Sequence, residues 1–473
     1  MNFTLANTVN PNRVFLIRKS ELEKRLDAEY YIPSLVALEK KVLAKNPKKL
    51  RDYVLGIASG ATPKTTESEL YYTDKENGMP FLRVQNLSPT GILEFDDCKY
   101  INHQTHSVML KRSQVSAGDL LVKITGVGRM AVASVAPEGF EGNINQHVCV
   151  IKTGSREVSE MLAAFLNSDI GEKLASRRST GGTRPALDYP ALLSIPILYN
   201  KRVLEISKKV IEQKTKNEAA AENLLTSIDA YLLKELGITL PTPPENILKN
   251  RIFQTSIKTI TGDRFDPYHH QQSFTDIIKA IHNGKFTTDI FKHLITDLKN
   301  GVEIRNYVTE GGVRYLRVTD LDKTGLNHSS PRFVSEQEVP DRIKLNSNCI
   351  LISRSGSLGL VSVVEPEIEN SILSSHIFKV ELKTEKILPH FLEAYLRSVV
   401  GQSEIFRNNN GGVIPEINQE ALKSIFISVP PIKKQEEMIK HILEIRMQAS
   451  QLKNKTSELL KNASEEIEEI LLG

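Results

Sequence analysis

Two glycine-rich segments are the first places in this sequence where residue type and spacing suggest chemistry. They are Gly126-Val127-Gly128 and Ser355-Gly356-Ser357-Leu358-Gly359. Such loops bind phosphate through backbone N–H groups, but a nucleotide-binding loop also needs a Lys followed by Ser or Thr, which neither segment has. The sequence also has no Gly-x-Gly-x-x-Gly after a predicted strand and no His-Glu-x-x-His. We therefore expect neither a nucleotide-binding loop nor a His-Glu-x-x-His metal site.

Three other features that could carry chemistry have simpler interpretations. Asp266-Pro267-Tyr268-His269 is similar to the Asp-Pro-Pro-Tyr loop of adenine methyltransferases, but it lacks the second Pro and no cofactor-binding glycine motif accompanies it. The pair Asp96-Asp97 is typical of a solvated turn rather than of an acid/base pair. The cysteines, Cys98, Cys149 and Cys349, are odd in number and far apart, which argues against a disulfide framework or a cysteine zinc site. No catalytic residue and no metal ligand is predicted.

Length, charge and hydropathy limit the class of protein further. The chain has 473 residues, enough for more than one hydrophobic core, and a formal net charge of only +4. If such a chain binds DNA, its basic and acidic side chains must be sorted onto different faces. It has no uncharged apolar run of about 18 residues, and its N-terminus lacks the basic and apolar regions of a secretory signal. We therefore expect a cytoplasmic protein that does not span a membrane.

An internal duplication is the strongest pattern in the sequence. Five segments of the first half recur in the same order in the second half: residues 12–15 as 250–253, 25–31 as 264–270, 81–87 as 315–321, 120–126 as 350–356, and 181–182 as 411–412. The offset falls only from 238 residues at the first pair to 230 at the last. Because five matches in register do not arise readily by chance, we interpret the chain as two copies of one unit.

Each copy begins with a region that predicts a mixed α/β fold. Short apolar runs at residues 120–126, 131–136 and 147–152 predict strands, as do those at 349–356, 360–364 and 376–382. Helical periodicity follows at residues 159–167 and 389–398. The fold class expected is α/β, in the mixed α+β sense, with one globule at residues 1–200 and another at 250–431.

Each globule is followed by a long predicted helix. Residues 203–236 contain neither Pro nor Gly, and apolar residues of the C-terminal segment step by three and four from residue 442 to 463, as in a coiled coil. We expect helices at 201–237 and 432–473, with a Pro-rich linker at 238–249. We predict that they pack on each other antiparallel, although each could instead fold back onto its own globule. The residues expected at the helix–helix interface are Ile206, Val210, Leu224, Ile442, Ile445, Leu452 and Leu459.

The order of these motifs resembles the specificity subunits of type I restriction-modification systems. The similarity lies in Ser59-Gly60-Ala61-Thr62-Pro63, residues 81–87, Gly118-Asp119-Leu120-Leu121 and Asn145-Gln146-His147-Val148 of the first copy, and in residues 351–359, 427–431 and Gln435 of the second. No single motif is specific, but their duplicated order covers nearly the whole chain. The second copy lacks the Ser-Gly-x-Thr-Pro turn. Residues 25–31 also occur in type IIB-like systems, so a specificity subunit of such a system is an alternative.

The resemblance implies a DNA-reading subunit that is not itself an enzyme. It implies two target-recognition domains, each reading one half of a split double-stranded DNA site, and two helices that act as a ruler between them. It implies docking of two methyltransferase subunits and of restriction/translocase subunits. S-adenosylmethionine, ATP and Mg²⁺ would belong to those partners, in a bacterial or archaeal cytoplasm.

Candidate DNA contacts follow from the duplicated positions, because Arg and Lys bind phosphate and Arg also pairs with guanine. They are Thr62, Arg83, Lys123, Arg129, Arg184, Arg317, Arg354, Asn409 and Asn410. Each arginine could instead form a structural salt bridge, and the equivalent His147 and His376 could either contact DNA or maintain the fold. Residues shared by the copies are expected to keep the fold or hold phosphate, whereas base-reading residues should differ. A helical scaffold that reads no DNA and a divergent methyltransferase remain alternatives.

Overall fold

Two compact units make up the chain in a computed structural model. Unit 1 comprises Met1–Glu218 and Lys453–Gly473, and unit 2 comprises Ala219–Leu452. The structure describes residues 9–23, 25–242, 247, 252–254, 256–257, 264–309, 311–322, 325–339, 345–347 and 349–473. Residues 243–246 and 248–251, which include part of the predicted linker and the start of the second repeat, lie outside the described residues.

An antiparallel sheet forms the centre of unit 1. Its strands follow the order β2-β10-β7-β8, with bounds Gly56–Ser59, Val148–Lys152, Leu120–Lys123 and Ala133–Val135. All residues of β7 are buried: the apolar run Leu120-Leu121-Val122 agrees with this burial, and Lys123 is buried with it. Helix α3 (Arg156–Asn167) packs against β8, and α4 (Asp169–Arg178) packs against α3.

The rest of the first globule surrounds this sheet. A five-stranded sheet has the order β3-β5-β4-β9-β6, in which β4 and β9 run parallel; its strands are Tyr72–Thr73, Lys99–Ile101, Met79–Leu82, Glu141–Ile144 and Gln114–Ser116. Strands β1 (Lys48–Lys49) and β11 (Pro196–Ile197) form an antiparallel pair. The remaining α-helices are α1 (Pro33–Leu43), α2 (Ser68–Tyr71) and α5 (Tyr189–Leu193).

Unit 2 repeats the four-stranded sheet of unit 1 strand by strand, whereas its second sheet is smaller. Its antiparallel sheet has the order β13-β21-β18-β19, with bounds Ile295–Asn300, Ile377–Leu382, Cys349–Ser353 and Val361–Val363. A second sheet, β17-β14-β20 (Arg332–Val334, Val313–Leu316, Ile372–Leu373), again contains one parallel pair, β14 and β20. The antiparallel pair β12–β22 (Thr288–Ile290, Phe426–Ser428) matches β1–β11. The repeated sequence therefore folds into the same four-stranded sheet and outer strand pair in both units.

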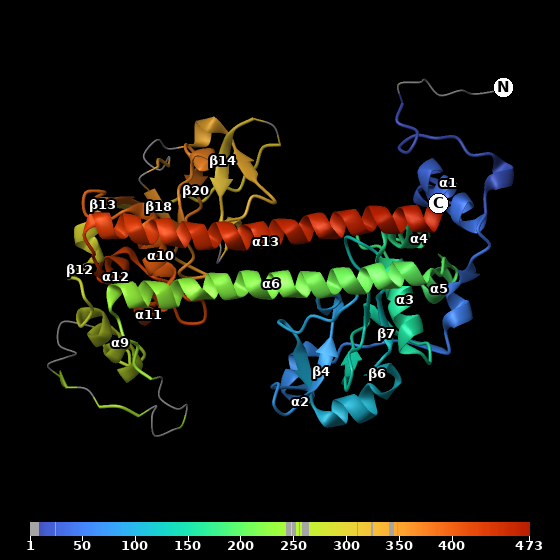
Figure 1. Ribbon diagram of the computed structural model, residues 1–473, viewed down its shortest axis with the longest axis horizontal. Coiled ribbons are helices and arrows are strands. Elements are labelled where there is room, and N and C mark those ends of the chain that lie inside the picture. The colour runs from blue at the N-terminus through green and yellow to red at the C-terminus, as the bar shows by residue number, and fades with distance from the viewer. Residues whose placement is uncertain are drawn as a thin grey trace. The chain divides into compact units, whose positions relative to one another are not determined.

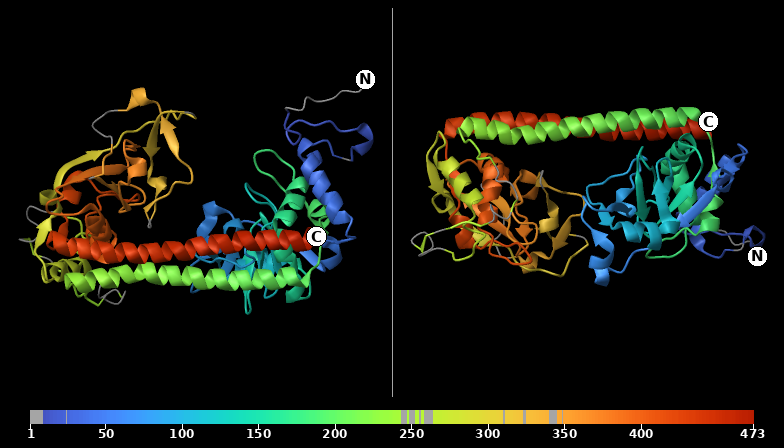
Figure 2. Two further views of the ribbon diagram at one scale, coloured as in Figure 1. Left: turned by 45° about the horizontal axis from the view of Figure 1, so that its top comes forward. Right: turned by 90° about the horizontal axis from the view of Figure 1, so that it is seen from below.

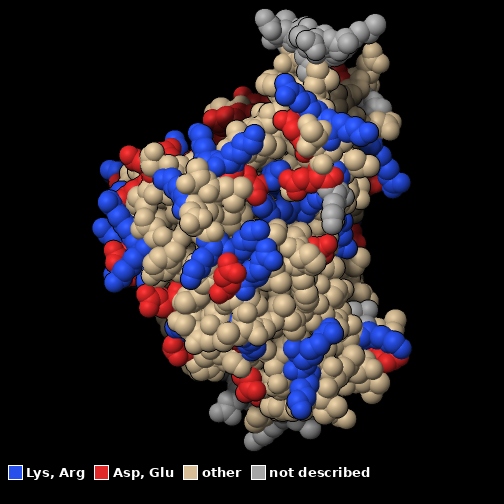
Figure 3. All heavy atoms as spheres, turned by 90° about the vertical axis from the view of Figure 1, so that its right-hand side faces the viewer, with Lys and Arg blue, Asp and Glu red and all other residues tan. Residues whose placement is uncertain are grey.

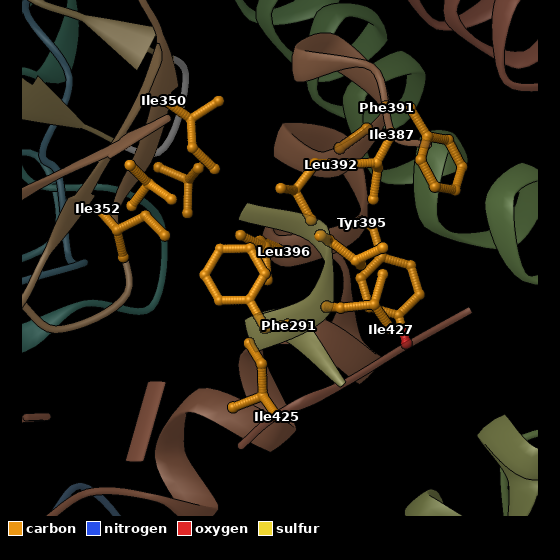
Figure 4. Packing of buried hydrophobic residues seen from close by; sticks show 14 of the residues in the cluster. Phe291, Ile350, Ile352, Ile387, Phe391, Leu392, Tyr395, Leu396, Ile425 and Ile427 are labelled. Carbon is orange, nitrogen blue, oxygen red and sulfur yellow. The ribbon is translucent and has the colours of Figure 1, made fainter. Parts of the chain in front are cut away.

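Unit 2 also contains short helices and a small antiparallel strand pair. The pair consists of β15 (Leu321–Asp322) and β16 (Gly325–Leu326). The helices are α9 (Gln272–His282), α10 (Pro389–Arg397), α11 (Val399–Arg407) and α12 (Gln419–Lys423). Figure 4 shows the core, in which Phe291 and Tyr395 lie among isoleucines and leucines of several elements. The Tyr395 hydroxyl, although buried, donates a hydrogen bond to the Phe426 carbonyl at 3.2 Å.

Two long helices run through both units. Helix α6 spans Lys201–Leu236 and α13 spans Ile432–Leu472, and in each unit they lie side by side (Figures 1 and 2). In unit 1, Arg202 near the start of α6 pairs with Glu466 near the end of α13 at 3.0 Å. In unit 2, Glu235 near the end of α6 pairs with Lys434 near the start of α13 at 2.7 Å. The predicted antiparallel pairing is confirmed, as is the mixed α/β fold class.

The long helices also contribute to the core of each globule. Val203 and Leu204 of α6 and Ile467 and Leu471 of α13 belong to the core of unit 1. Leu232, Leu236, Met438 and Ile442 belong to that of unit 2. Of the residues predicted at the helix interface, Val210, Ile442 and Ile445 are buried, while Ile206, Leu224, Leu452 and Leu459 are half-buried. No helix among the described residues is long and apolar enough to cross a membrane.

Candidate nucleic-acid interface

Two equivalent loops project from the globules, one in each unit. The first loop (residues 180–186) closes on itself through reciprocal backbone hydrogen bonds of 2.8 Å between Thr180 and Ala186. In the second loop (residues 410–416), Asn410 N–H donates to the Glu416 carbonyl at 2.6 Å. A glycine of the neighbouring turn ties each loop down: Gly126 N–H donates to the Pro185 carbonyl at 3.0 Å, and Gly356 N–H to that of Pro415 at 3.1 Å. The two loops thus share one backbone arrangement.

Asn409 and Asn410, both predicted to bind DNA, hold the second loop together. The side-chain oxygen of Asn409 accepts hydrogen bonds from the backbone N–H of Gly411 at 2.9 Å and of Glu416 at 2.8 Å. That of Asn410 accepts from Asn418 N–H at 3.3 Å. Asn410 is exposed, whereas Asn409 is half-buried. The two amides leave their NH₂ groups as the donors available for an outside contact.

Arg354 supports the same loop from the β18 side. Its guanidinium forms an ion pair with Glu416, and its Nη1 donates to the Ser375 carbonyl at 3.3 Å. The guanidinium also lies 5.6 Å from the centre of the Phe378 ring. These contacts fix Arg354 at the base of the second loop, so a DNA contact would require it to exchange the carboxylate of Glu416 for a phosphate or base.

Lys123, another predicted contact, is buried and supports the turn that follows β7. Its Nζ donates to the Val127 carbonyl at 2.7 Å and to the Arg129 carbonyl at 3.0 Å, and burial lowers the pKa of this lysine. Gly126 and Gly128 adopt φ values of 131° and 82°, which L side chains rarely adopt. In unit 2 the equivalent position is Ser353, whose buried hydroxyl donates to the Ser357 carbonyl. Both side chains satisfy carbonyl groups of a tight turn.

Replacing Lys123 with Met is expected to lower the free energy of unfolding by about 1–3 kcal/mol, because two inward-facing carbonyls lose their donor. The exposed Lys111→Met variant is the matched control, since it removes the same charge without a buried hydrogen bond. Urea unfolding of both variants measures the difference. Equal stability of the two would contradict the supporting role of Lys123.

Arg83 and Arg317 occupy equivalent places and pair with carboxylates in both units. Arg83 Nη2 lies 3.0 Å from Asp97, whose pKa is lowered by a hydrogen bond from Gln85 and by the charge of Arg83. Arg317 binds Asp320 through two nitrogens, at 2.8 and 3.1 Å. Both side chains are partly exposed, at 20% and 25%. In each unit, therefore, the arginine forms the structural salt bridge that was the alternative to a DNA contact.

The three remaining predicted contacts, Thr62, Arg129 and Arg184, differ in their interactions with the rest of the protein. Arg129 pairs with Asp169 at 3.0 Å and donates to the Asn167 carbonyl, whereas exposed Thr62 donates to the side chain of Gln146. Arg184 is exposed at the tip of the first loop, and no salt bridge involves it among the described residues. Burial and the charge of Arg184 together lower the pKa of His147. Arg184 is thus the predicted cation most available to an anion.

Arg25 and Arg264 each contact the residue just before one of the loops, although neither was among the predicted DNA contacts. Arg25 donates to the Ser179 carbonyl at 2.9 Å, and Arg264 to the Asn409 carbonyl at 2.6 Å, across sequence separations of 154 and 145 residues. Each is also paired with the Asp two positions later, at 2.6 Å. The repeated Arg-x-Asp at residues 25–27 and 264–266 was the sequence signal for them.

Charge on one face of the molecule is mixed rather than sorted. In Figure 3, Lys and Arg side chains form separate groups with Asp and Glu side chains between them. Binding that depends only on phosphate charge requires a continuous basic surface, which this face does not present. On this face, an anion would therefore have to be bound by particular side chains.

Comparison with known proteins finds similarity to one family of DNA specificity domains over part of the chain. Residues 310–469 match the family model of the type I restriction modification DNA specificity domain. The chain is 20% identical to the type I restriction enzyme EcoKI specificity subunit of Escherichia coli strain K12 over 436 residues, 88% of this chain and 86% of that protein. It is 23% identical to the EcoBI specificity subunit of Escherichia coli over 177 residues, which span 37% of this chain and only 35% of that protein.

Solved structures of similar proteins also match along most of the chain. A type I restriction-modification S subunit from M. genitalium is 13% identical, with 90% of this chain and 94% of that chain covered and a TM-score of 0.40. The HsdS subunit from Thermoanaerobacter tengcongensis is 15% identical, with 90% and 94% covered and a TM-score of 0.32.

Proposed function

We propose that this chain is a specificity subunit of a type I restriction-modification system and that it recognises a double-stranded DNA target in two parts, one per globule. The observation that carries the proposal is the repeated central topology, because the four-stranded sheets of units 1 and 2 have the same strand order and both units carry equivalent loops. Two like surfaces in one chain suit a target with two separate halves. Different side chains on a shared backbone would let each half have its own sequence.

We infer that the chemistry belongs to partner subunits. Two methyltransferase subunits would bring S-adenosylmethionine, and restriction/translocase subunits would bring ATP and Mg²⁺, in the cytoplasm of a bacterium or archaeon. The full sequence has no nucleotide-binding loop and no His-Glu-x-x-His motif. The chain's own part would be to bind DNA and to hold those subunits at the target.

The test is to express the chain with the methyltransferase encoded beside it and to sequence methylated adenines across a genome. We expect methylation at one sequence made of two fixed halves with a constant gap. The chain alone, given labelled S-adenosylmethionine and the same DNA, should transfer no methyl group. Methylation without sequence preference would favour the scaffold alternative, and transfer by the isolated chain would favour a divergent methyltransferase; either result would contradict the proposal.

A further inference from the structure

We propose that the second loop reads the 5-methyl groups of thymine through Val413 and Ile414, whereas the first loop presents Thr183 and Arg184 at the equivalent places. The inference rests on the proposed function, and it identifies which base group the second globule recognises.

The tip of the second loop is apolar and faces solvent. Val413 is fully exposed and Ile414 is 62% exposed. A single exposed apolar residue is common on protein surfaces, but two adjacent ones on a projecting loop form a small contact surface. Neither side chain can donate or accept a hydrogen bond, so these two side chains can recognise only an apolar group.

Hydrogen bonds fix the base of the second loop. Glu416 N–H and Gly411 N–H both donate to Asn409, and Gly356 N–H holds the Pro415 carbonyl. Arg264, which is paired with Asp266 near the start of the second repeat, donates a hydrogen bond to the Asn409 carbonyl. A contact made by a rigid loop loses less conformational entropy on binding than one made by a flexible loop.

The same support exists in unit 1, although the tip residues differ. Arg25, which is paired with Asp27, donates a hydrogen bond to the Ser179 carbonyl, and Gly126 N–H donates to the carbonyl of Pro185. On this shared support, Thr183 corresponds to Val413 and Arg184 to Ile414. The duplication has therefore kept the scaffold of the loop and changed the chemistry of its tip from polar and cationic to apolar.

This divergence favours DNA over a protein partner at the loop tips. Two copies of one methyltransferase subunit would meet two equivalent surfaces, which would keep the same chemistry in both repeats. Two different DNA half-sites require different residues. In the major groove, thymine C5 carries the one methyl group among the base edges, whereas Arg pairs with guanine and Thr bonds to either donors or acceptors. The geometry and the chemistry together assign the apolar tip to thymine.

The test uses the assembled complex with its methyltransferase and DNA in which deoxyuridine replaces thymine, one half-site at a time. Uracil keeps the base pairing and the minor groove and removes only the methyl group. For the wild-type complex, substitution in the half-site of the second globule should weaken binding roughly fourfold for each methyl that is contacted, as expected for one apolar carbon group. A Val413→Ser/Ile414→Ser variant should bind thymine DNA more weakly and show no further loss on uracil DNA.

The matched control is Thr183→Ala/Arg184→Ala, which changes the equivalent tip of the first loop. This variant should show the full loss of binding on uracil substitution in the second half-site. Its overall affinity for DNA should be lower, because its contact with the first half-site is weakened. Both pairs lie on exposed loop tips, so thermal unfolding should match the wild type.

An equal uracil effect in the wild type and the Val413→Ser/Ile414→Ser variant, or no uracil effect at all in the second half-site, would overturn the assignment. So would a Val413→Ser/Ile414→Ser variant that no longer assembles with the methyltransferase, since the tip would then be a protein contact. The proposed function fails separately, by the absence of any two-part methylated site.

Discussion

Exchanging residues 1–200 for those of a related chain should change one half of the methylated DNA sequence and leave the other half unchanged. The reason is that, among the described residues, each sheet is built from strands of one unit only. Each mismatched base pair costs about 1–3 kcal/mol, so the original half-site should be lost as a target once several of its bases are no longer read. Genome-wide mapping of methylated adenines measures the outcome.

The exchange has to respect the contacts between the globule and the long helices. Val203, Leu204, Ile467 and Leu471 belong to the same core as the first globule, so they should be replaced by the residues of the donor chain. The reciprocal exchange of residues 250–431 is the control and should alter only the other half. If either exchange changed both halves together, the two globules would read DNA as a single surface, and the assignment of one half to each would be wrong.

Changing Ile442 to Asp should destabilise unit 2 by roughly 4 kcal/mol or more, because it combines a lost aliphatic side chain with a buried charge. Ile442 is only 2% exposed and belongs to the core that α13 shares with α6 and the second globule. Calorimetry of the full chain should show this as a large fall in the unfolding temperature. Assembly with the methyltransferase should fail at temperatures where the wild type still assembles.

Leu443→Asp is the matched control, since the neighbouring side chain on α13 is 43% exposed. It introduces the same charge and nearly the same change in helix propensity at a position outside the core. We expect its unfolding temperature to stay within a few degrees of the wild type. If the two variants were equally stable, the inward face of α13 would not carry the packing energy that we assign to it.

The repeated order of motifs in the sequence already determined that the chain is duplicated and mixed α/β. The apolar run at residues 120–122 indicates a buried strand, and the stretch without Pro or Gly after residue 202 indicates a long helix. These features are local, because side-chain periodicity and backbone propensity act over a few neighbouring residues. The resemblance to type I specificity subunits also follows from the order of local motifs, which needs no knowledge of their contacts.

Only the tertiary structure decided what individual polar side chains do. Lys123 and Arg184 are both cations predicted to contact DNA, but Lys123 is buried against two carbonyls whereas Arg184 is exposed. Arg25 meets the Ser179 carbonyl across 154 residues, a pairing that no local pattern indicates. The long helices joined the cores of the globules as well as each other for the same reason. Burial and long-range hydrogen bonds depend on which distant segments the fold brings together, and a local residue pattern contains no information about that.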